Sequence, residues 1–228
     1  MKILLKTCCF ILISSLNLLE ATTAYFTPPE SWKEVDPKHL SPLVQMGYVG
    51  KGKEGFSPSI NIAKEPIDQM SQKEYLQIVK KLHKDHPGTS WRHLGSLQTQ
   101  SGKADLTEIT VENHLGTVKL LQCIIAKNGY AHILTGASSS KEFGKFRQIF
   151  TQSFRSFAVV QDLMEAIQNP AKKTAVQQKL LSLKQLLKSS ISAKEKEKAA
   201  LGFHQYLVDE CKEQGKYWQY LMIKQLQN

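Results

Sequence analysis

A glycine-rich segment is the first place in this 228-residue chain where residue types and spacing suggest chemistry. Gly50 to Gly55 reads G-x-G-x-x-G, the spacing that lets a backbone wrap a pyrophosphate when the glycines open a helix. Here the next residues are Phe56-Ser57-Pro58 and the alternating Ile60-Asn61-Ile62, which favour a loop and then a strand. Without the helix, the pattern predicts a hairpin loop and no bound nucleotide.

Two histidines form the second pattern. His83 and His86 lie one helical turn apart, a spacing at which two imidazoles can share a metal ion, and Asp85 and His93 are near in sequence. The pair falls at the predicted end of a helix, where cations interact favourably with the helix dipole. A metal site also needs a third ligand and supporting hydrogen bonds. We therefore predict a solvated helix terminus and no metal ligand here.

Ser138 to Lys141 contains S-x-x-K, a spacing found in serine acyl enzymes. The companion S-D-N and K-T-G motifs are missing, and Ser139 can instead cap a helix with Glu142. The chain also has no G-x-S-x-G, H-E-x-x-H, P-loop or C-x-x-C pattern. We therefore predict no catalytic, cofactor-binding or metal-binding residues, no cofactor, and a protein that is not an enzyme.

The N-terminal residues predict export. Lys2 and Lys6 precede the mostly apolar stretch Thr7–Leu19, and the small residues Ala21-Thr22-Thr23-Ala24 follow. This order is typical of a secretory signal peptide over residues 1–24, with cleavage after Ala24. The apolar stretch is shorter than the roughly 20 residues of a membrane span, although an uncleaved membrane anchor stays open as the alternative. We expect an exported protein, either periplasmic or secreted.

Cleavage would leave two cysteines in the mature chain, Cys123 in a predicted strand and Cys211 in a predicted helix. An oxidising compartment would allow them to form a disulfide. They are far apart in sequence, and each falls in an element that we expect to be buried. We interpret them as two buried free thiols, with the disulfide as the open alternative.

The composition is that of an ordinary globular protein, with 41% hydrophobic and 22% charged residues. These values exclude a disordered acidic tail, a collagen-like fibre and a disulfide-rich miniprotein. The chain has 30 Lys+Arg against 20 Asp+Glu, for a net charge of +10 that is spread along its length. Such charge can simply aid solubility, or it can attract nucleic acid or anionic lipid. Export argues against nucleic acid and leaves anionic lipid or an acidic protein as partners.

The hydrophobic pattern divides the chain after the leader into two parts. Residues 25–160 mix strand and helix patterns, whereas residues 161–228 have helix patterns alone. Three capping boxes, S-x-x-E, predict helix starts at Ser71, Ser139 and Ser192. The expected strands are 46–49, 60–63, 91–99, 104–112, 117–126 and 130–137, and the expected helices are 71–84, 139 onward, 171–188, 192 onward and 217–227. The predicted fold class is α+β, an antiparallel sheet packed with helices, plus a C-terminal helical segment.

Apolar side chains predict how two of these helices pack. The helix 71–84 has an expected apolar stripe of Tyr75, Ile78, Val79 and Leu82. Near the C-terminus, Tyr217, Trp218 and Tyr220 form a cluster that can either anchor the last helix on the first domain or present an exposed binding patch. We favour the anchor, because buried aromatic residues commonly hold a helix on its domain.

Several segments of the first part follow one order. They are Trp32 near the start, the Pro-x-I-x-I strand within Phe56–Ile62, the helix start Ser71–Tyr75, the strand Gly129–Ala137 and the helix within Phe143–Phe157. In this order, residues 30–157 resemble the PsbP-like family, which includes an extrinsic photosystem subunit, a Ran-binding nuclear import factor and DcrB-like periplasmic proteins. The resemblance implies an α/β/α sandwich and no shared catalytic residues. Residues 161–228 lie outside it.

These observations together predict a secreted or periplasmic, non-enzymatic protein that binds another protein as an assembly accessory factor. We expect a signal peptide over residues 1–24, a PsbP-like α+β domain over 25–160 and a helical extension over 161–228. The alternative function is an envelope-associated protein that binds anionic lipid through this basic extension. Its lysines are Lys172, Lys173, Lys179, Lys184, Lys188, Lys194, Lys196 and Lys198. Glu195 and Glu197 alternate with the last three, which is typical of a solvated face.

Overall fold

The computed structural model describes residues 22–53, 55–113 and 116–226. Over these residues the chain forms a seven-stranded antiparallel sheet, with strand order β2-β3-β4-β8-β7-β6-β5, and a separate two-stranded ribbon of β1 and β9. The strands are β1 (Thr23–Tyr25), β2 (Lys33–Glu34), β3 (Val44–Val49), β4 (Ser59–Pro66), β5 (Thr89–Thr99), β6 (Gly102–Asn113), β7 (Gly116–Lys127), β8 (Tyr130–Ser139) and β9 (Ala158–Val160).

Five α-helices and three short 3-10 helices complete the described chain. The α-helices are α1 (Gln72–Asp85), α2 (Phe143–Arg155), α3 (Pro170–Lys188), α4 (Ala193–Glu210) and α5 (Gly215–Lys224), and the 3-10 helices are η1 (Pro37–His39), η2 (Leu163–Ala166) and η3 (Lys212–Gln214). None of the α-helices in the described ranges is long and apolar enough to cross a membrane. The predicted signal peptide lies almost entirely outside these ranges.

The turn between β7 and β8 illustrates how local sequence sets the sheet. Asn128 and Gly129 both have positive φ, 50° and 75°, which is the conformation of a two-residue type I′ hairpin. Such a turn matches the right-handed twist of the strands, so it fixes the register in which Lys127 faces Tyr130. The Asn-Gly hairpin that the sequence predicts is therefore present.

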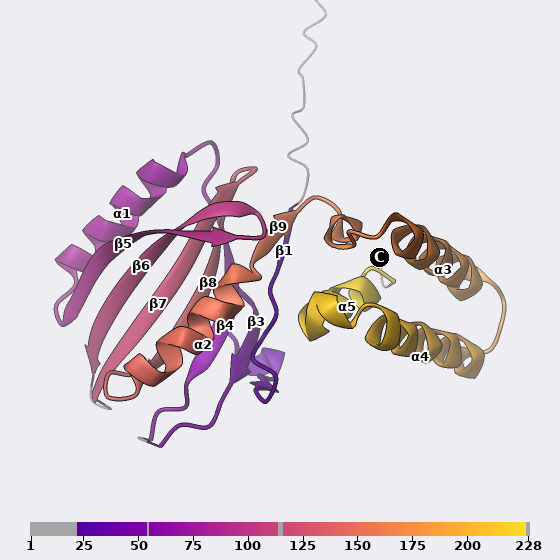
Figure 1. The fold of residues 1–228 in the computed structure, drawn as a ribbon, viewed down its shortest axis with the longest axis horizontal. Coiled ribbons are helices and arrows are strands. Elements are labelled where there is room, and N and C mark those ends of the chain that lie inside the picture. The colour runs from indigo at the N-terminus through magenta and orange to yellow at the C-terminus, as the bar shows by residue number, and fades with distance from the viewer. Residues whose placement is uncertain (1–21, 54, 114–115, 227–228) are drawn as a thin grey trace, which may run out of the picture.

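Helices cover both faces of the sheet (Figure 1). On one face, Tyr75 and Leu76 of α1 pack against Ile124 and Ile133. On the other, the phenylalanines of α2 join a larger core that continues into the C-terminal helices. Side chains alternate between the two faces along each strand, so the central strands β7 and β8 supply both cores. The α+β class with an α/β/α sandwich is confirmed.

A phenylalanine and a glycine set the distance between α2 and β8. Phe150 is fully buried, and a Cβ added at Gly136 would lie 2.4 Å from its ring. That distance is far below van der Waals contact, so any side chain at position 136 would push the helix off the sheet. The glycine is needed here for close approach rather than for backbone freedom.

The prediction of one buried apolar face on α1 is wrong for two of its four residues. Tyr75 is buried, but Ile78 and Leu82 are 45% and 65% exposed. The helix is fixed at its first turn, where the Gln72 side chain accepts a hydrogen bond from Ala126 N and the Tyr75 hydroxyl donates to Glu65. These two hydrogen bonds turn the helix face of residues 72, 76 and 79 toward the sheet. Ile78 and Leu82 therefore point outward.

Two of the three predicted capping boxes are present. Ser71 with Glu74 starts α1, and Ser192 with Glu195 starts α4, each with both reciprocal hydrogen bonds. The prediction at Ser139 is wrong, because β8 continues to Ser139 and α2 starts only at Phe143, with Glu142 at the cap. The Ser139 hydroxyl accepts from the Glu142 amide in the turn that joins the two elements.

After β9 the described elements are all helical. Asn169 caps α3 and Pro170 occupies its first position, an arrangement in which the proline loses no helical hydrogen bond. α3 and α4 form a hairpin that projects away from the sheet, and α5 returns between this hairpin and the end of the sheet near β1 (Figure 1). Cys123 and Cys211 are both buried and free, as the thiol interpretation predicts.

Candidate functional site

The junction between the sheet and the C-terminal helices is held by α5. Trp218 is fully buried, and its Nε1 donates a hydrogen bond of 2.9 Å to the carbonyl oxygen of Leu163 in η2. Tyr217 is also buried, and its ring meets that of Phe26 edge-on, with centroids 5.7 Å apart. These contacts give Tyr217 and Trp218 the anchoring role that the sequence favours. Tyr220, by contrast, is 40% exposed.

A glutamine ties α5 to the hairpin. Gln219 is buried, and its Nε2 lies 3.2 Å from the carbonyl oxygen of Leu207 and 3.3 Å from that of Cys211, both at the end of α4. Each of these carbonyls also accepts a hydrogen bond from a main-chain amide, Leu207 from Cys211 and Cys211 from Gln214. The side chain of Gln219 therefore adds a further donor at the end of α4 and joins α5 to it.

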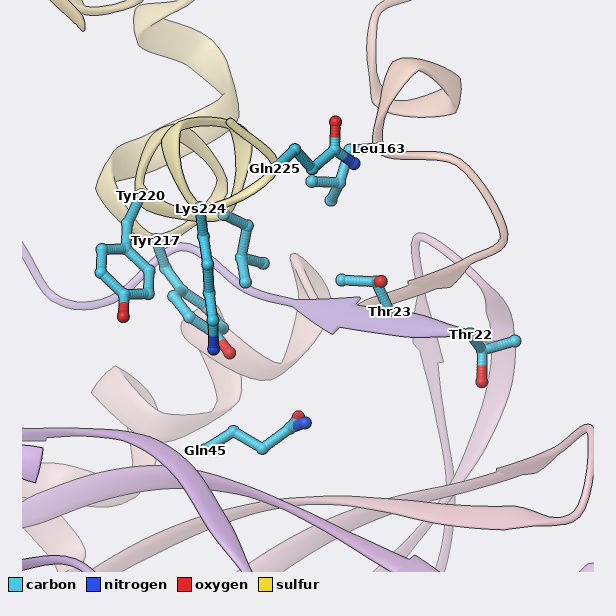
Figure 2. A pocket seen from close by; sticks show the side chains of 9 residues that line it. Thr22, Thr23, Gln45, Leu163, Tyr217, Tyr220, Lys224 and Gln225 are labelled. Atoms are coloured by element: carbon cyan, nitrogen blue, oxygen red, sulfur yellow. The ribbon is translucent and has the colours of Figure 1, made fainter. Parts of the chain in front are cut away.

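A small polar pocket lies on one side of α5 (Figure 2). Its volume is about 220 Å³. Figure 2 shows the Lys224 side chain descending from α5 beside Tyr217, opposite Thr22, Thr23 and Gln45. No carboxylate is among its lining residues. Burial is the main cause that raises the pKa of Tyr217 above its ordinary value, so its hydroxyl stays protonated at neutral pH.

A larger apolar groove lies between α4 and α5. It has a volume of about 550 Å³ and is lined by Leu201 and Val208 of α4 and by Tyr220 and Ile223 of α5. Leu201 is 61% exposed and Val208 is 37% exposed. Large apolar side chains this exposed cost free energy in water unless something covers them. They gather on one groove, which is unlike the single scattered exposures of an ordinary surface.

This groove continues onto the sheet domain. A second hollow of about 610 Å³ is lined by Pro28, Pro29, Trp32 and Tyr48. It shares Val208, Lys216 and Gln219 with the first hollow, so the two adjoin. We call the pair the junction groove, defined by Leu201, Val208, Tyr220, Trp32 and Tyr48. It runs from the proline-rich segment before β2 to the outer face of α4.

The rim of the junction groove has charges of both signs. Glu30 and Glu34 come from the sheet side, whereas Lys212 comes from η3 and Lys216 from the start of α5. Glu197, His204 and Asp209 of α4 complete the rim. An apolar floor with a mixed polar rim is the usual layout of a protein-binding surface. A ligand that fits it would need an apolar face and charged edges.

The residues that the sequence singled out for chemistry are not brought together. The Gly50–Gly55 segment joins β3 to β4 without opening a helix, and the Lys53 amide donates to Glu142. Ser138 is buried in β8, and its hydroxyl donates to the Ser139 carbonyl. The serine is 1% exposed, so a substrate in solution cannot reach its hydroxyl.

The histidines are also dispersed. The carbonyl of His83 accepts a hydrogen bond from Thr89 Oγ1, and His86 lies at the end of α1, where its Nδ1 contacts the carbonyl of Pro87. His93 instead contacts Asp105 across the sheet, at 2.7 Å. Among the residues that the structure describes, no three His, Cys, Asp or Glu side chains lie close enough to share a metal ion.

One buried polar contact had no sequence signal. His132 is fully buried in β8, and its Nε2 lies 3.0 Å from the hydroxyl of Thr22. Burial, helped by the positive charges of Lys64 and Lys127, lowers the pKa of His132 to about 4. The histidine is therefore neutral at physiological pH. The two residues are 110 positions apart in sequence, so no local pattern could pair them.

Comparisons with known proteins show likeness in structure only. No family model matches the chain, and no curated protein matches it in sequence. Solved structures that match include LpqN of Mycobacterium tuberculosis, described as involved in cell envelope biogenesis. It is 14% identical, with a TM-score of 0.49, and the match covers 62% of this chain and 85% of that one.

Two further matches correspond to the family that the sequence resembles. The PsbP protein of Synechocystis sp. PCC 6803 is 13% identical over 68% of this chain and 99% of its own, with a TM-score of 0.41. The Ran-binding protein Mog1p of Saccharomyces cerevisiae is 15% identical over 61% and 97%, with a TM-score of 0.42. The solved structures that match thus include members of the family that residues 30–157 resemble. A likeness at this distance concerns the fold alone.

Proposed function

We propose that this protein is exported, acts without catalysis, and binds an apolar segment of another protein in the junction groove. Residues 25–160 supply the sheet side of the groove, and the extension over residues 161–228 supplies the helical side. The groove has the apolar floor and the charged rim that are typical of a surface that binds another protein.

The observation that carries this proposal is the clustering of exposed apolar side chains. Leu201, Val208 and Tyr220 come from two helices, and all three line the same groove. Trp32 and Tyr48 extend it with aromatic surface, and aromatic residues supply much of the binding energy in interfaces. Within the described ranges, no three His, Cys, Asp or Glu side chains could hold a metal ion.

A capture experiment with matched variants tests the proposal. The full chain, tagged at its C-terminus, is expressed in its own host, cross-linked and purified from the exported fraction, and its partners are identified by mass spectrometry. Leu201→Glu places a charge in the groove, and Leu181→Glu places the same charge on α3, where Leu181 is 60% exposed and lines neither hollow of the groove. We expect a partner that the wild type and Leu181→Glu retain and Leu201→Glu loses. Equal capture by all three proteins contradicts groove binding.

A second candidate function is binding to an anionic lipid surface through α3. Residues 170–194 contain six lysines and no Asp or Glu. Leu181 and Leu186 of α3 are 60% and 39% exposed. Lys172 pairs with Glu213. Exposed leucines beside lysines on one helix are typical of helices that lie on anionic membranes. This surface is separate from the junction groove.

Co-sedimentation with vesicles distinguishes the two functions. If α3 binds lipid, the full chain sediments with phosphatidylglycerol vesicles at low salt and is released above about 0.5 M salt, where screening acts within a few Å. Leu181→Glu together with Lys184→Gln and Lys188→Gln would abolish this binding, and Leu201→Glu would not. Absence of sedimentation at low salt contradicts the lipid function and leaves groove binding untouched.

A further inference from the structure

The strand β1 is an integral part of the fold. Its residues Thr23, Ala24 and Tyr25 pair with Val160, Val159 and Ala158 of β9. Ala24 and Tyr25 are 2% and 4% exposed, so the strand is covered as well as paired. β9 has β1 as its strand partner in the two-stranded ribbon. The segment that the sequence assigns to the end of a signal peptide therefore occupies a core position.

Thr22 adds two polar contacts immediately before this strand. It is 3% exposed, its hydroxyl lies 3.0 Å from His132 Nε2, and its carbonyl accepts a hydrogen bond of 2.9 Å from Lys64 Nζ. The other nitrogen of His132, Nδ1, is buried and has no hydrogen-bond partner among the described residues. Thr22 thus supplies the hydrogen bond that this buried imidazole makes.

Removal of Thr22 to Ala24 would break each of these contacts. His132 would keep two buried nitrogens without partners, and Lys64 would lose its carbonyl acceptor. β9 would lose most of its strand pairing. The new chain end would also place an ammonium group on buried Tyr25, and a buried charge without a partner is strongly unfavourable. Cleavage after Ala24, which the sequence predicts, would therefore remove a packed part of this fold.

We propose that the leader is removed at or before the bond between Ala21 and Thr22, so that the mature chain keeps Thr22, Thr23 and Ala24. This inference rests on the proposed export, because it concerns where an exported chain is processed. Ala21 has the small side chain that the residue preceding a signal cleavage site requires. The retained residues also complete the pocket of Figure 2, which Thr22 and Thr23 line.

Intact-mass measurement of the protein recovered from the exported fraction tests the position directly. The full coding sequence is expressed with its own N-terminus, and the mass gives the first residue of the mature chain. A chain that begins at Thr22 or at an earlier residue is the expected result. A chain that begins at Thr23 or at any later residue overturns the inference, even if export itself is confirmed.

A second measurement tests the contact on which the inference rests, whether or not the chain is exported. In the full chain, Thr22→Val removes the hydroxyl that contacts His132 and keeps the strand, and Thr23→Val is the matched control, because Thr23 makes no such contact. We expect Thr22→Val to lower the Tm by about 3–8 °C and the control to change it by less than 2 °C. Equal Tm values overturn the inference, whereas retention of an unprocessed leader inside the cell counts against the proposed export alone.

Discussion

The indole N–H of Trp218 donates a hydrogen bond to the main-chain carbonyl of Leu163, 55 residues earlier in the chain, at a distance of 2.9 Å. Leu163 begins η2, the element after β9, and Trp218 lies on α5. The bond therefore joins the end of the chain to the point where the sheet domain passes into helices. It holds α5, and with it one wall of the junction groove, in place.

Trp218→Phe tests this relationship. The substitution keeps an aromatic ring but leaves the Leu163 carbonyl without its donor, so we expect a loss of about 1–3 kcal/mol in the free energy of unfolding. Tyr220→Phe is the control, because it removes a polar atom from the same helix at a residue that is 40% exposed. It should lower the free energy of unfolding by less than about 0.5 kcal/mol. Urea denaturation of the two variants beside the wild type measures the difference. Equal effects would show that the Trp218 bond does not stabilise the junction.

The contact between Phe150 and Gly136 leads to a second prediction. Gly136→Ala places a methyl group 2.4 Å from the Phe150 ring, and we expect about 1–3 kcal/mol of destabilisation from the overpacking. Gly144→Ala is the control on α2, since no atom lies within 4 Å of the added carbon. Alanine in place of a helical glycine without contacts stabilises the helix, so the free energy of unfolding of this variant should rise by up to about 1 kcal/mol. A stable Gly136→Ala protein would contradict the close approach of α2 and β8.

Stability should depend on pH through His132. Its pKa is about 4 in the folded protein and about 6.5 in the unfolded chain. Above pH 6.5 both states hold neutral histidine, and between pH 6.5 and pH 4 the unfolded state binds the proton first. This group therefore lowers stability as the pH falls through that window, by about 3 kcal/mol in total.

His132→Gln isolates this contribution. Glutamine does not titrate, so the variant should lose stability less steeply than the wild type between pH 6.5 and pH 5, above the range in which most carboxylates titrate. Chemical denaturation at several pH values gives the two slopes. Parallel slopes would mean that His132 is not held neutral in the fold.

Local sequence predicts most of the sheet domain because its determinants are close in sequence. The Asn128-Gly129 turn sets the β7–β8 hairpin, and the Ser71–Glu74 capping box starts α1. The same kind of reasoning fails at Ser139, because a strand that continues through Ser139 overrides the helix start. Periodicity also misplaces the buried face of α1, since it cannot tell that Gln72 and Tyr75 bond the sheet.

The candidate site depends on contacts between residues far apart in sequence. Tyr217 and Trp218 can be assigned as anchors from their residue types, but their contacts with Phe26 and Leu163 come only from the folded chain. The junction groove is likewise built from Trp32 and Tyr48 on one side and α4 and α5 on the other. The contact between Thr22 and His132, which are 110 residues apart, likewise comes only from the folded chain.

Site-specific photo-crosslinking tests the central claim, binding of a protein segment in the junction groove, most directly. A photoreactive amino acid replaces Leu201 in the groove or Leu181 on the outer face of α3, two leucines that are 61% and 60% exposed, and the full chain is irradiated in its own cells. We predict a covalent product with another protein from position 201 and none with that protein from position 181. No such product from position 201, or the same product from both positions, would contradict the proposed function.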